Sequence, residues 1–549
     1  MFMKKYFLWI AIPFLLAACS KTSTPSNFDP HAMQGMPCHK MGDTYMGDCE
    51  FDENGNLLNP NGHTGHSTSK IPFSQETEGL AEAKPSEMVE LKDGDTYEMT
   101  AGLVKQEVGG REVKRLAYNG QIPGPLLKVP QNAEINLVFK NELDIDTTLH
   151  SHGLRLDNAF DGVPGVTQKT IQPGETFTYK LRFPDEGIYW YHPHVREDYA
   201  QELGLYGNFL VDPSQQDYWS PVNREVAWML DDLLADETQP QFSKTETDHS
   251  LMGRFGNVML LNNEENYQLK VKQGELIRFY TTNVANVRPF NISIQNTPLK
   301  LVGGDIGRIE KEVEQNQILL APAERSIFEA KFDQPGTFDI VHKTPEKTYI
   351  LGQIVVEGKA ETVGNFQAYR DNSADFKTIR DQLDTLLKKS PDKSLILSVD
   401  MMGMGNMSMG MMHQGATGGI EWEDGMGMMN SASTSENTTW KMIDDQTKKS
   451  NMDIDWSFKK GDLVKIKIFN DSHSMHPMQH PIHFHGQRFL VLTRDGKTND
   501  NFQWKDTALI KSGETVELLV EMSNPGKWMA HCHIAEHLHS GMMMEFNVQ

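Results

Sequence analysis

Three stretches of the chain share one pattern of polar and apolar positions: a polar turn, then alternating apolar residues, then Asn. They are LKVPQNAEINLVFKN (127–141), LKVKQGELIRFYTTN (269–283) and FKKGDLVKIKIFN (458–470). Successive side chains of a β-strand point to opposite faces, so this alternation is typical of a strand that is buried on one side. The pattern therefore predicts the same strand unit three times.

A second unit is also repeated three times, and each copy predicts two strands joined by a turn. The copies are IQPGETFTYKLRFPDEGIYWYHPH (171–194), LAPAERSIFEAKFDQPGTFDIVH (320–342) and IKSGETVELLVEMSNPGKWMAHCH (510–533). Repetition of both units at similar offsets predicts an all-β chain with three β-sandwich domains of one kind, which also suits a length of 549 residues. We place the domains at residues 85–214, 220–360 and 390–549. A short helix is predicted only over RDQLDTLLKKSP (380–391).

The N-terminus carries an export signal. Two lysines precede an apolar run from Phe7 to Leu16, which is too short to cross a bilayer and predicts a signal peptide. The run ends in LAAC at Cys19, which resembles the bacterial lipobox. This resemblance implies a lipoprotein-type signal over residues 1–19, a lipid anchor on Cys19 and a place on the periplasmic side of the bacterial cell envelope. Ordinary cleavage after small residues is the alternative.

Residues 20–84 are polar and rich in Gly, Pro and Ser, a composition typical of a flexible tether. The tether contains Cys38 and Cys49, and exported thiols meet an oxidising environment, so we expect the two to pair. If Cys19 carries lipid, Cys532 is then left alone among the four cysteines. A lone thiol in such a place is a liability unless something occupies it.

The formal net charge of −23 argues against nucleic acid as a partner, because phosphate contacts need a basic surface. The hydrophobic content of 38% supports globular folding rather than general disorder.

Histidines gather in four motifs at the ends of the repeated units: LHSHG, WYHPH, HPIHFHG and HCHIAEH. Residues i and i+2 of a strand face the same side, so each His-x-His pair directs two imidazoles to one place. In the last motif His531 and His533 point one way, and Cys532 points the opposite way. The thiolate can therefore bind one metal ion while its two neighbours bind another.

The donor types indicate which metal. Two His, one Cys and a weak axial Met form a trigonal blue-copper electron-transfer site. Cys532, His537 and Met542 are suitably spaced for it, and His480 can complete the set. Zinc would favour four strong ligands in a tetrahedron. Single His-x-His pairs are more often structural, but four such motifs with an interleaved Cys make that interpretation improbable, and the other clustered histidines require further metal ions.

Over residues 85–549 these motifs closely resemble the three-domain multicopper oxidase family, which includes laccases and bacterial cuprous oxidases. The resemblance implies three cupredoxin-like Greek-key β-sandwich domains and four copper ions, with a trinuclear cluster between the first and third domains. It implies type 1 copper on His480, Cys532 and His537 with axial Met542, and type 2 copper on His150 and His483. The type 3 coppers would take His152, His192, His194, His485, His531 and His533.

The second domain departs from this pattern. Its counterpart of the HSHG loop is PFNISIQ (289–295), which has no histidine, and its late strand ends with His342 alone. We therefore expect this domain to act as a spacer and His342 to be structural.

The resemblance also implies how electrons and protons move. Type 1 copper would collect single electrons and pass them along Cys532 to the flanking histidines, so that O2 is reduced to water with four electrons. Asp161 in LDNAFDGVPG matches the family position of an acid beside the cluster, which makes it a candidate catalytic proton relay; a turn Asp before Gly is the alternative. Leu538 stands where some relatives have a second acid.

Ten methionines lie within residues 400–429. Thioether sulfur selects Cu(I), and the segment resembles the Met-rich insertion of bacterial cuprous oxidases, here residues 400–430. That resemblance implies a substrate-copper site close to type 1 copper, and a disordered loop with little effect on turnover is the alternative. The candidate substrate ligands are Asp400, Met401, Met402, Met404, His476 and Met478. His476 replaces an expected Asp four residues before His480. Copper gathering by the tether is the alternative to a disulfide there.

The leading hypothesis is an envelope-anchored, monomeric oxidase that converts Cu(I) to Cu(II) with O2 and so contributes to copper tolerance. A laccase-like oxidase of phenols or of Fe(II) is the enzymatic alternative, although HSMHPMQHPIHFHG lacks the carboxylates that Fe(II) would favour. A copper-buffering protein without catalysis is the alternative from another class.

Overall fold

The computed structural model describes residues 72–235, 241–361, 363–402 and 416–549, together with two short strands, β1 (His39–Met41) and β2 (Thr44–Met46), which pair antiparallel. The signal peptide with Cys19, the tether cysteines Cys38 and Cys49, and Met404 lie outside the described residues. The chain divides into a unit of residues 1–69 and a unit of residues 70–549, and the following description concerns the second.

The first domain consists of two sheets. One has the order β3-β6-β11-β10-β8, with β3 (Met88–Glu90), β6 (Leu126–Pro130), β8 (His150–His152), β10 (Gly187–His192) and β11 (Gly207–Asp212). The other has the order β5-β4-β7-β9, with β4 (Thr96–Val108), β5 (Arg111–Tyr118), β7 (Glu134–Asn141) and β9 (Thr176–Arg182). Tyr118 and Tyr191 meet between the sheets at 5.2 Å, within one buried hydrophobic cluster.

The second domain repeats the plan with eleven strands. Its first sheet has the order β13-β12-β15-β20-β17-β18, with β12 (Arg224–Leu233), β13 (Val258–Leu261), β15 (Glu275–Asn283), β17 (Leu299–Gly304), β18 (Arg308–Gln315) and β20 (Arg325–Phe332). Its second sheet has the order β14-β22-β21-β16-β19, with β14 (Tyr267–Gln273), β16 (Phe290–Ile294), β19 (Ile318–Leu320), β21 (Gly336–Lys343) and β22 (Thr348–Lys359).

The third domain has the same topology as the second. One sheet has the order β26-β23-β28-β33-β30-β31, with β23 (Lys393–Met401), β26 (Thr438–Asp444), β28 (Leu463–Asn470), β30 (Arg488–Arg494), β31 (Lys497–Thr498) and β33 (Thr515–Glu521). The other has the order β27-β35-β34-β29-β32, with β27 (Trp456–Phe458), β29 (His480–Phe484), β32 (Thr507–Ile510), β34 (Gly526–Cys532) and β35 (Met543–Val548). A small hairpin of β24 (Ala416–Thr417) and β25 (Ile420–Glu421) lies in the insertion.

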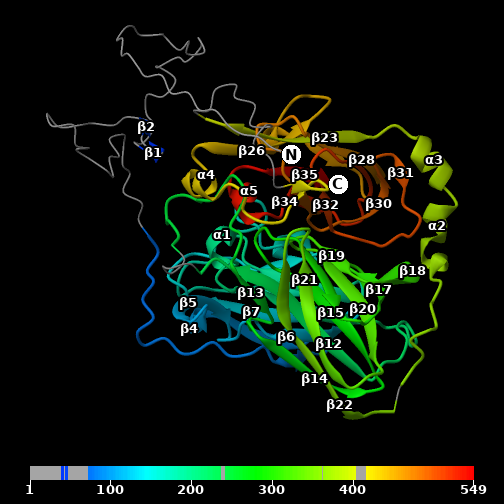
Figure 1. The fold of residues 1–549 in the computed structure, drawn as a ribbon. Coiled ribbons are helices and arrows are strands. Elements are labelled where there is room, and N and C mark those ends of the chain that lie inside the picture. Colours follow the sequence, from blue (N-terminus) through cyan, green and yellow to red (C-terminus); the bar gives the residue numbers. More distant parts are fainter. Residues whose placement is uncertain (1–38, 42–43, 47–71, 236–240, 362, 403–415) are drawn as a thin grey trace, which may run out of the picture. The chain divides into compact units, whose positions relative to one another are not determined.

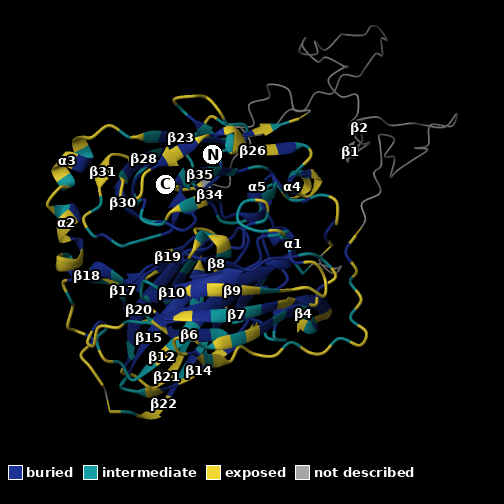
Figure 2. Cartoon of the chain, turned by 180° about the vertical axis from the view of Figure 1, so that it is seen from behind, coloured by how far each residue is buried: buried dark blue, intermediate teal, exposed yellow. Residues whose placement is uncertain are grey.

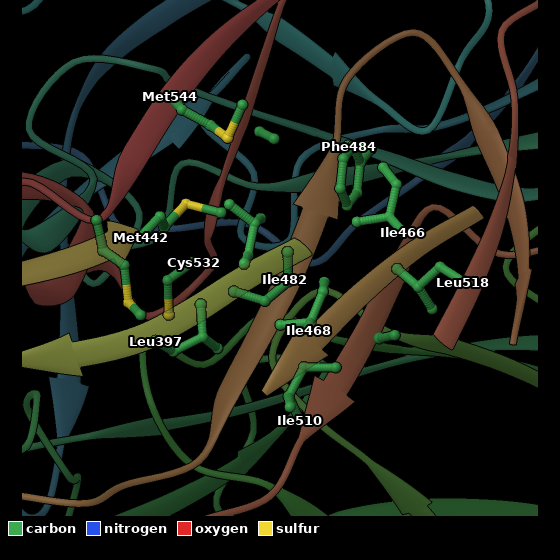
Figure 3. Packing of buried hydrophobic residues seen from close by; sticks show 14 of the residues in the cluster. Leu397, Met442, Ile466, Ile468, Ile482, Phe484, Ile510, Leu518, Cys532 and Met544 are labelled. Carbon is green, nitrogen blue, oxygen red and sulfur yellow. The ribbon is translucent and has the colours of Figure 1, made fainter. Parts of the chain in front are cut away.

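The prediction of an all-β chain with three cupredoxin-like sandwiches is confirmed, because strand order corresponds one to one between the second and third domains. Figure 1 shows the predominance of strands over the few short helices. The first domain lacks only the counterparts of β17, β18 and β19. Figure 2 shows that the strands form the buried interior and that exposed residues concentrate in the connections. Figure 3 shows the core of the third domain, in which Cys532 lies among Leu397, Met442 and Ile482.

The ordered structure begins earlier than residue 85, so the flexible-tether prediction is wrong for residues 72–84. Phe73 is buried and stacks on Tyr199 with ring centroids 3.8 Å apart. The backbone of Ala83 and Lys84 forms hydrogen bonds with Lys105 and Gly120. The polar composition of this stretch concealed it, because main-chain hydrogen bonds hold Ala83 and Lys84, and Phe73 is the one buried side chain among residues 72–84.

Helices are few and short. α2 (Lys377–Arg380) and α3 (Leu383–Lys388) occupy the connection before the third domain, so the helix predicted over 380–391 is present but shorter, as α3, and α2 ends where the predicted range begins. The remaining helices are α1 (Glu197–Ala200), α4 (Gly427–Ala432) and α5 (Ala535–His539), with 3-10 turns η2 (Asn158–Phe160), η3 (Ser373–Phe376) and η5 (Asn451–Asp453). No helix in the described part of the chain is both long and apolar enough to span a membrane.

Candidate metal centres

A mononuclear site lies inside the third domain. Cys532 at the end of β34, His480 on β29 and His537 in α5 bring their ligand atoms within 4.8 Å of one another. The Cys532 sulfur lies 3.6 Å from His480 Nδ1 and 3.9 Å from His537 Nδ1, and the two nitrogens are 3.3 Å apart. All three side chains are buried. One sulfur and two imidazole nitrogens therefore converge on a single point.

Met542 borders this site. It is fully buried, its N–H donates to the His537 carbonyl, and its own carbonyl accepts from the Cys532 N–H, both at 3.0 Å. These two backbone bonds fix Met542 relative to two of the three ligands. Trp440 stacks on His537 with centroids 4.0 Å apart, which holds that imidazole in place.

The surroundings of Cys532 determine its charge. Burial in an apolar core raises the pKa of the thiol well above its ordinary value, and the one hydrogen bond that offsets this is donated by the Ile534 N–H at 3.4 Å. Without a metal ion the thiol is therefore protonated at neutral pH. A bound cation has to displace that proton, as is usual for thiolate metal sites.

The other eight histidines converge between the first and third domains. They form three groups whose ligand atoms lie within 4.8 Å of one another: His150, His152 and His483; His152, His192 and His533; and His194, His485 and His531. All of these side chains are buried. The first domain supplies β8 and the end of β10, and the third supplies β29 and the end of β34.

Strand register explains this convergence. His150 pairs with His192 across β8 and β10, and His483 pairs with His531 across β29 and β34. In the second domain the equivalent pair is Ile292 and His342. In the first and third domains both paired positions thus carry a histidine, whereas in the second domain one of them carries an isoleucine.

The hydrogen bonds leave one nitrogen of each cluster histidine for a metal. Buried nitrogens without a protein partner are His150 Nε2, His152 Nδ1, His192 Nε2, His194 Nε2, His483 Nε2 and His533 Nε2. The Nε2 atoms of His485 and His531 face each other at 3.0 Å. A buried polar atom without a partner is costly unless a metal or water satisfies it, so these residues fit bound metal ions.

The opposite nitrogens are held by the protein. His150 Nδ1 bonds the Asp161 carbonyl at 2.7 Å, and His483 Nδ1 bonds the Asp506 carbonyl at 2.9 Å. His192 and His531 bond the carbonyls of Pro193 and Cys532, and His194 Nδ1 lies 3.0 Å from Glu197 Oε1. Such partners set the tautomer and ring orientation of metal-binding histidines.

Burial lowers the pKa of the two histidines of the mononuclear site, His480 and His537, and of six cluster histidines: His152, His192, His483, His485, His531 and His533. The value falls to about 3 for His480, His485 and His533. Desolvation of the charged form is the main cause. The rings are therefore neutral at physiological pH, which is the form that binds metals.

Asp161 joins two of the histidine groups. Its Oδ2 accepts from His485 Nδ1 at 2.9 Å, and its Oδ1 lies 3.4 Å from His150 Nδ1. Burial raises the pKa of the carboxyl, but the two histidines outweigh this effect and hold the pKa below its ordinary value. The next residue is Gly162 (φ +82°), where a Cβ would lie 2.1 Å from the Leu149 carbonyl oxygen. The turn at Asp161 and Gly162 therefore also places the Asp161 carboxylate against the histidine cluster.

Several residues of the site were missed by sequence reasoning. Glu197 Oε1 lies 3.0 Å from His194 Nδ1, and Glu197 Oε2 is hydrogen-bonded to His539 Nε2 at 2.6 Å, which places one carboxylate between a cluster histidine and a partly exposed one. The three-residue spacing of His194 and Glu197 around a helix start was the only signal. Asp506 bonds His152 Nε2 at 3.0 Å and has no sequence signal at all.

Glu536 was also missed. It lies beside His537 in α5 and is fully buried, and burial raises its pKa to about 8. The family resemblance places a second acid at position 538, where this chain has Leu538, and the acid Glu536 stands on the other side of His537.

The candidate substrate residues are only partly gathered. Met478 and His476 are fully buried, and Met401 packs against the core that contains Cys532. Asp400 precedes Met401 on β23 and so points to the opposite face, where it forms an ion pair with Lys441. Met402 is 73% exposed. The geometry therefore does not favour Asp400 as a ligand beside Met401.

Comparison with known proteins agrees with this geometry. Three multicopper oxidase family models match residues 103–216, 214–360 and 425–549. The multicopper oxidase mco of Staphylococcus aureus is 27% identical, over 79% of this chain and 83% of its own length. Copper resistance protein A of Pseudomonas syringae pv. tomato is 22% identical, over 85% of this chain and 95% of its own length.

A solved multicopper oxidase from Pseudomonas thermotolerans superposes with a TM-score of 0.63 at 24% identity, covering 84% of this chain and all of that one. At this level of sequence identity the similarity to the solved structure supports the fold. Because the family models together match most of the chain and the histidine groups could hold metal ions, the protein belongs to the multicopper oxidase family and is an oxidoreductase.

Proposed function

We propose that this oxidase oxidises Cu(I) to Cu(II) with O2 as the acceptor and thereby contributes to copper tolerance. Four Cu(I) ions, one O2 and four protons give four Cu(II) ions and two waters. The observation that carries the choice of substrate is a group of thioethers next to the mononuclear site. The name of the Pseudomonas syringae relative, which refers to copper resistance, supports the same choice.

Met401, Met426, Met429 and Met475 are partly buried and pack against the hydrophobic core that contains Cys532 and Met542. Met402 and Met428 extend this group to the surface, since they are 73% and 90% exposed. Soft thioether sulfur prefers Cu(I) over Fe(II) or a phenol. The group would deliver a cuprous ion to within electron-transfer reach of the mononuclear site.

We propose resident coppers on His480, Cys532 and His537 with axial Met542, on His150 and His483, and as a pair on the six remaining histidines. When bound, these coppers take up single electrons and together supply the four that O2 requires. The protein orients its imidazoles through their far nitrogens, and it excludes bulk water by burying every ligand. Cys532 connects the two centres covalently, because His531 and His533 adjoin it in the chain.

Asp161 holds a carboxylate against His485 and His150, and we propose that it positions and relays protons for O2 reduction. Asp161→Asn should lower turnover by about 10²-fold or more, the usual contribution of a positioned acid–base group. The blue absorption should stay, since Asp161 does not contact the mononuclear ligands. Oxygen uptake with saturating Cu(I) and a visible spectrum check both points.

A matched control is Asp157→Asn, the same chemical change in the same turn. Asp157 is exposed and accepts from the Ala159 N–H, away from the histidines. It should leave turnover unchanged. If the two variants behaved alike, Asp161 would have only its turn-forming role.

The substrate proposal is tested on the Met-rich insertion. Removing all of 401–430 would also remove Asn430, which is fully buried and bonds Met252 and Gly253, so a deletion of residues 403–415 is cleaner. Met402→Leu removes a member of the thioether group and should lower the rate of oxygen uptake with Cu(I) severalfold. The deletion, which removes five other methionines of the insertion, should lower it as well, and rates with phenols should stay equal or rise. Met88→Leu, an equally conservative change at a 58% exposed methionine of the first domain, is the control.

The alternatives predict different outcomes. A laccase-like or ferrous oxidase would show its best kcat/KM with a phenol or Fe(II) and would be indifferent to the deletion. A copper buffer would bind the metal without consuming O2.

We further propose that the protein acts as a monomer on the periplasmic side of the cell envelope, held by lipid on Cys19. The support is the sequence Leu-Ala-Ala-Cys at the end of the apolar run. Cys19→Ala should release the protein from membranes upon cell fractionation.

A further inference from the structure

Arg325 of the second domain is a fully buried cation at the junction of all three domains. It begins β20, and its Nε donates to the Ile188 carbonyl of the first domain at 3.0 Å. Nη1 and Nη2 donate to Oδ1 and Oδ2 of Asp506 in the third domain at 2.6 and 2.5 Å. Two further bonds reach the carbonyls of Ala323 and Asp305. The planar guanidinium is thus fixed on both edges.

Asp506 in turn holds two histidines of the candidate cluster. Its Oδ1 accepts from His152 Nε2 at 3.0 Å, and its main-chain carbonyl accepts from His483 Nδ1 at 2.9 Å. His152 is the member of the cluster whose buried unpartnered atom is Nδ1 rather than Nε2. Its orientation is therefore set by this carboxylate together with the Thr507 hydroxyl, which lies 3.1 Å from His152 Nε2 and donates to Asp506 Oδ1. The other carboxylate oxygen, Oδ2, accepts from Arg325.

The chain is shaped to let this contact form. The residue after His152 is Gly153 (φ +85°), and a Cβ there would lie 2.4 Å from Asp506 Oδ2 and 2.8 Å from Arg325 Nη2. A bidentate Arg–carboxylate pair has a fixed geometry that a point charge cannot reproduce. A buried Asp without its cation would also be strongly destabilised.

We propose that Arg325 is a positioning residue for the trinuclear site and acts through Asp506 on His152 and His483. The second domain carries no proposed ligand, yet it takes part in building the site. The proposal rests on the assignment of His152 and His483 as copper ligands in the proposed function. Elemental analysis of the unaltered protein tests that assignment separately, since far fewer than four coppers per chain would remove it.

The experiment compares Arg325→Met and Arg325→Lys with Arg278→Met. Arg278 is a matched control: it is also a buried arginine of the second domain, paired with Glu329 at 2.8 Å, and it contacts no cluster residue. The readouts are copper per chain, the blue absorption, and the rate at which a chelator removes the cluster copper, followed by the type 2 electron paramagnetic resonance signal. The blue absorption is an internal reference, because Asp506 does not contact the mononuclear ligands.

Arg325→Met should release cluster copper about 10-fold faster or more, the usual effect of losing an outer partner of a metal ligand. The blue absorption should stay. Arg325→Lys should show a smaller change in the same direction and an altered type 2 signal, and it decides the question if Arg325→Met does not fold. Arg278→Met should lower thermal stability, but the chelator should remove its cluster copper at the same rate as from the unaltered protein.

A folded Arg325 variant with normal copper release and an unchanged type 2 signal would overturn the proposal. So would equal copper loss in Arg278→Met at matched thermal stability, because Arg325 would then serve the fold alone.

Discussion

Cys532→Ser should abolish both the intense blue absorption and turnover, while the trinuclear site keeps its copper. A hydroxyl is a hard donor and stays protonated, so it cannot replace the thiolate of a blue-copper site. Removal of the sulfur also breaks the covalent route to His531 and His533. The cluster ligands themselves are untouched, because His531 points to the opposite face of β34 and the other seven histidines lie outside this strand.

The measurements are a visible spectrum, copper per chain and oxygen uptake. Met544→Leu is the control, since Met544 is another buried sulfur residue of the same core and is not a proposed ligand. It should keep both colour and activity. A blue Cys532→Ser protein would disprove the assignment of the mononuclear site.

Copper-free protein should lose stability steeply when the pH falls below 6.5. Nine histidines among the described residues have a pKa lowered by burial from the ordinary value of 6.5, His480 and His342 to about 3. Between these two values the unfolded chain binds protons that the folded chain does not, so the free energy of unfolding falls as the pH falls. At pH 5.5 each such histidine costs about 1.4 kcal/mol.

Buried carboxyls titrate with the opposite sign. Burial raises the pKa of Glu202, Asp231, Asp232, Asp305 and Glu536, so their folded forms hold protons that the unfolded chain releases. The histidines outnumber them, and the net slope follows the histidines. Denaturant unfolding at pH 7.5, 6.5 and 5.5 measures it.

Two variants make the test specific. His342→Gln should reduce the slope by about one proton, since it removes a buried histidine that is not a proposed ligand. His473→Gln should leave the slope unchanged, because His473 is 88% exposed. If the pH dependence of the free energy of unfolding were the same in the unaltered protein and in both variants, the buried imidazoles would not govern acid stability.

The sequence was informative where function depends on local spacing. Alternation along a strand placed Cys532 and its flanking histidines on opposite faces, and the structure agrees: the sulfur joins the core while the imidazoles join the cluster. The repeated units likewise predicted three sandwiches before any contact was known.

Other features depend on tertiary contacts and could not be predicted. HCHIAEH shows no helical periodicity, yet the chain leaves β34 at Cys532 and enters α5 at Ala535, which brings His537 back to the sulfur. Arg325 and Asp506 are 181 residues apart and meet only because the second and third domains pack together. Residues 72–84 have the polar composition of a tether, and composition does not predict main-chain hydrogen bonds such as those of Ala83 and Lys84.

The register of the β29–β34 pair determines which face of the sheet each metal-binding side chain occupies. Ile482 stands opposite Cys532, and His483 opposite His531. A single inserted residue in β34 would move every later side chain to the opposite face of the strand. The Cys532 sulfur would then face the histidine cluster, and the imidazoles of His531 and His533 would face the hydrophobic core. A substitution in β34 changes one side chain, so its effect on the metal sites can be small or large. The insertion or deletion of one residue would instead exchange the surroundings of the sulfur and of the imidazoles together.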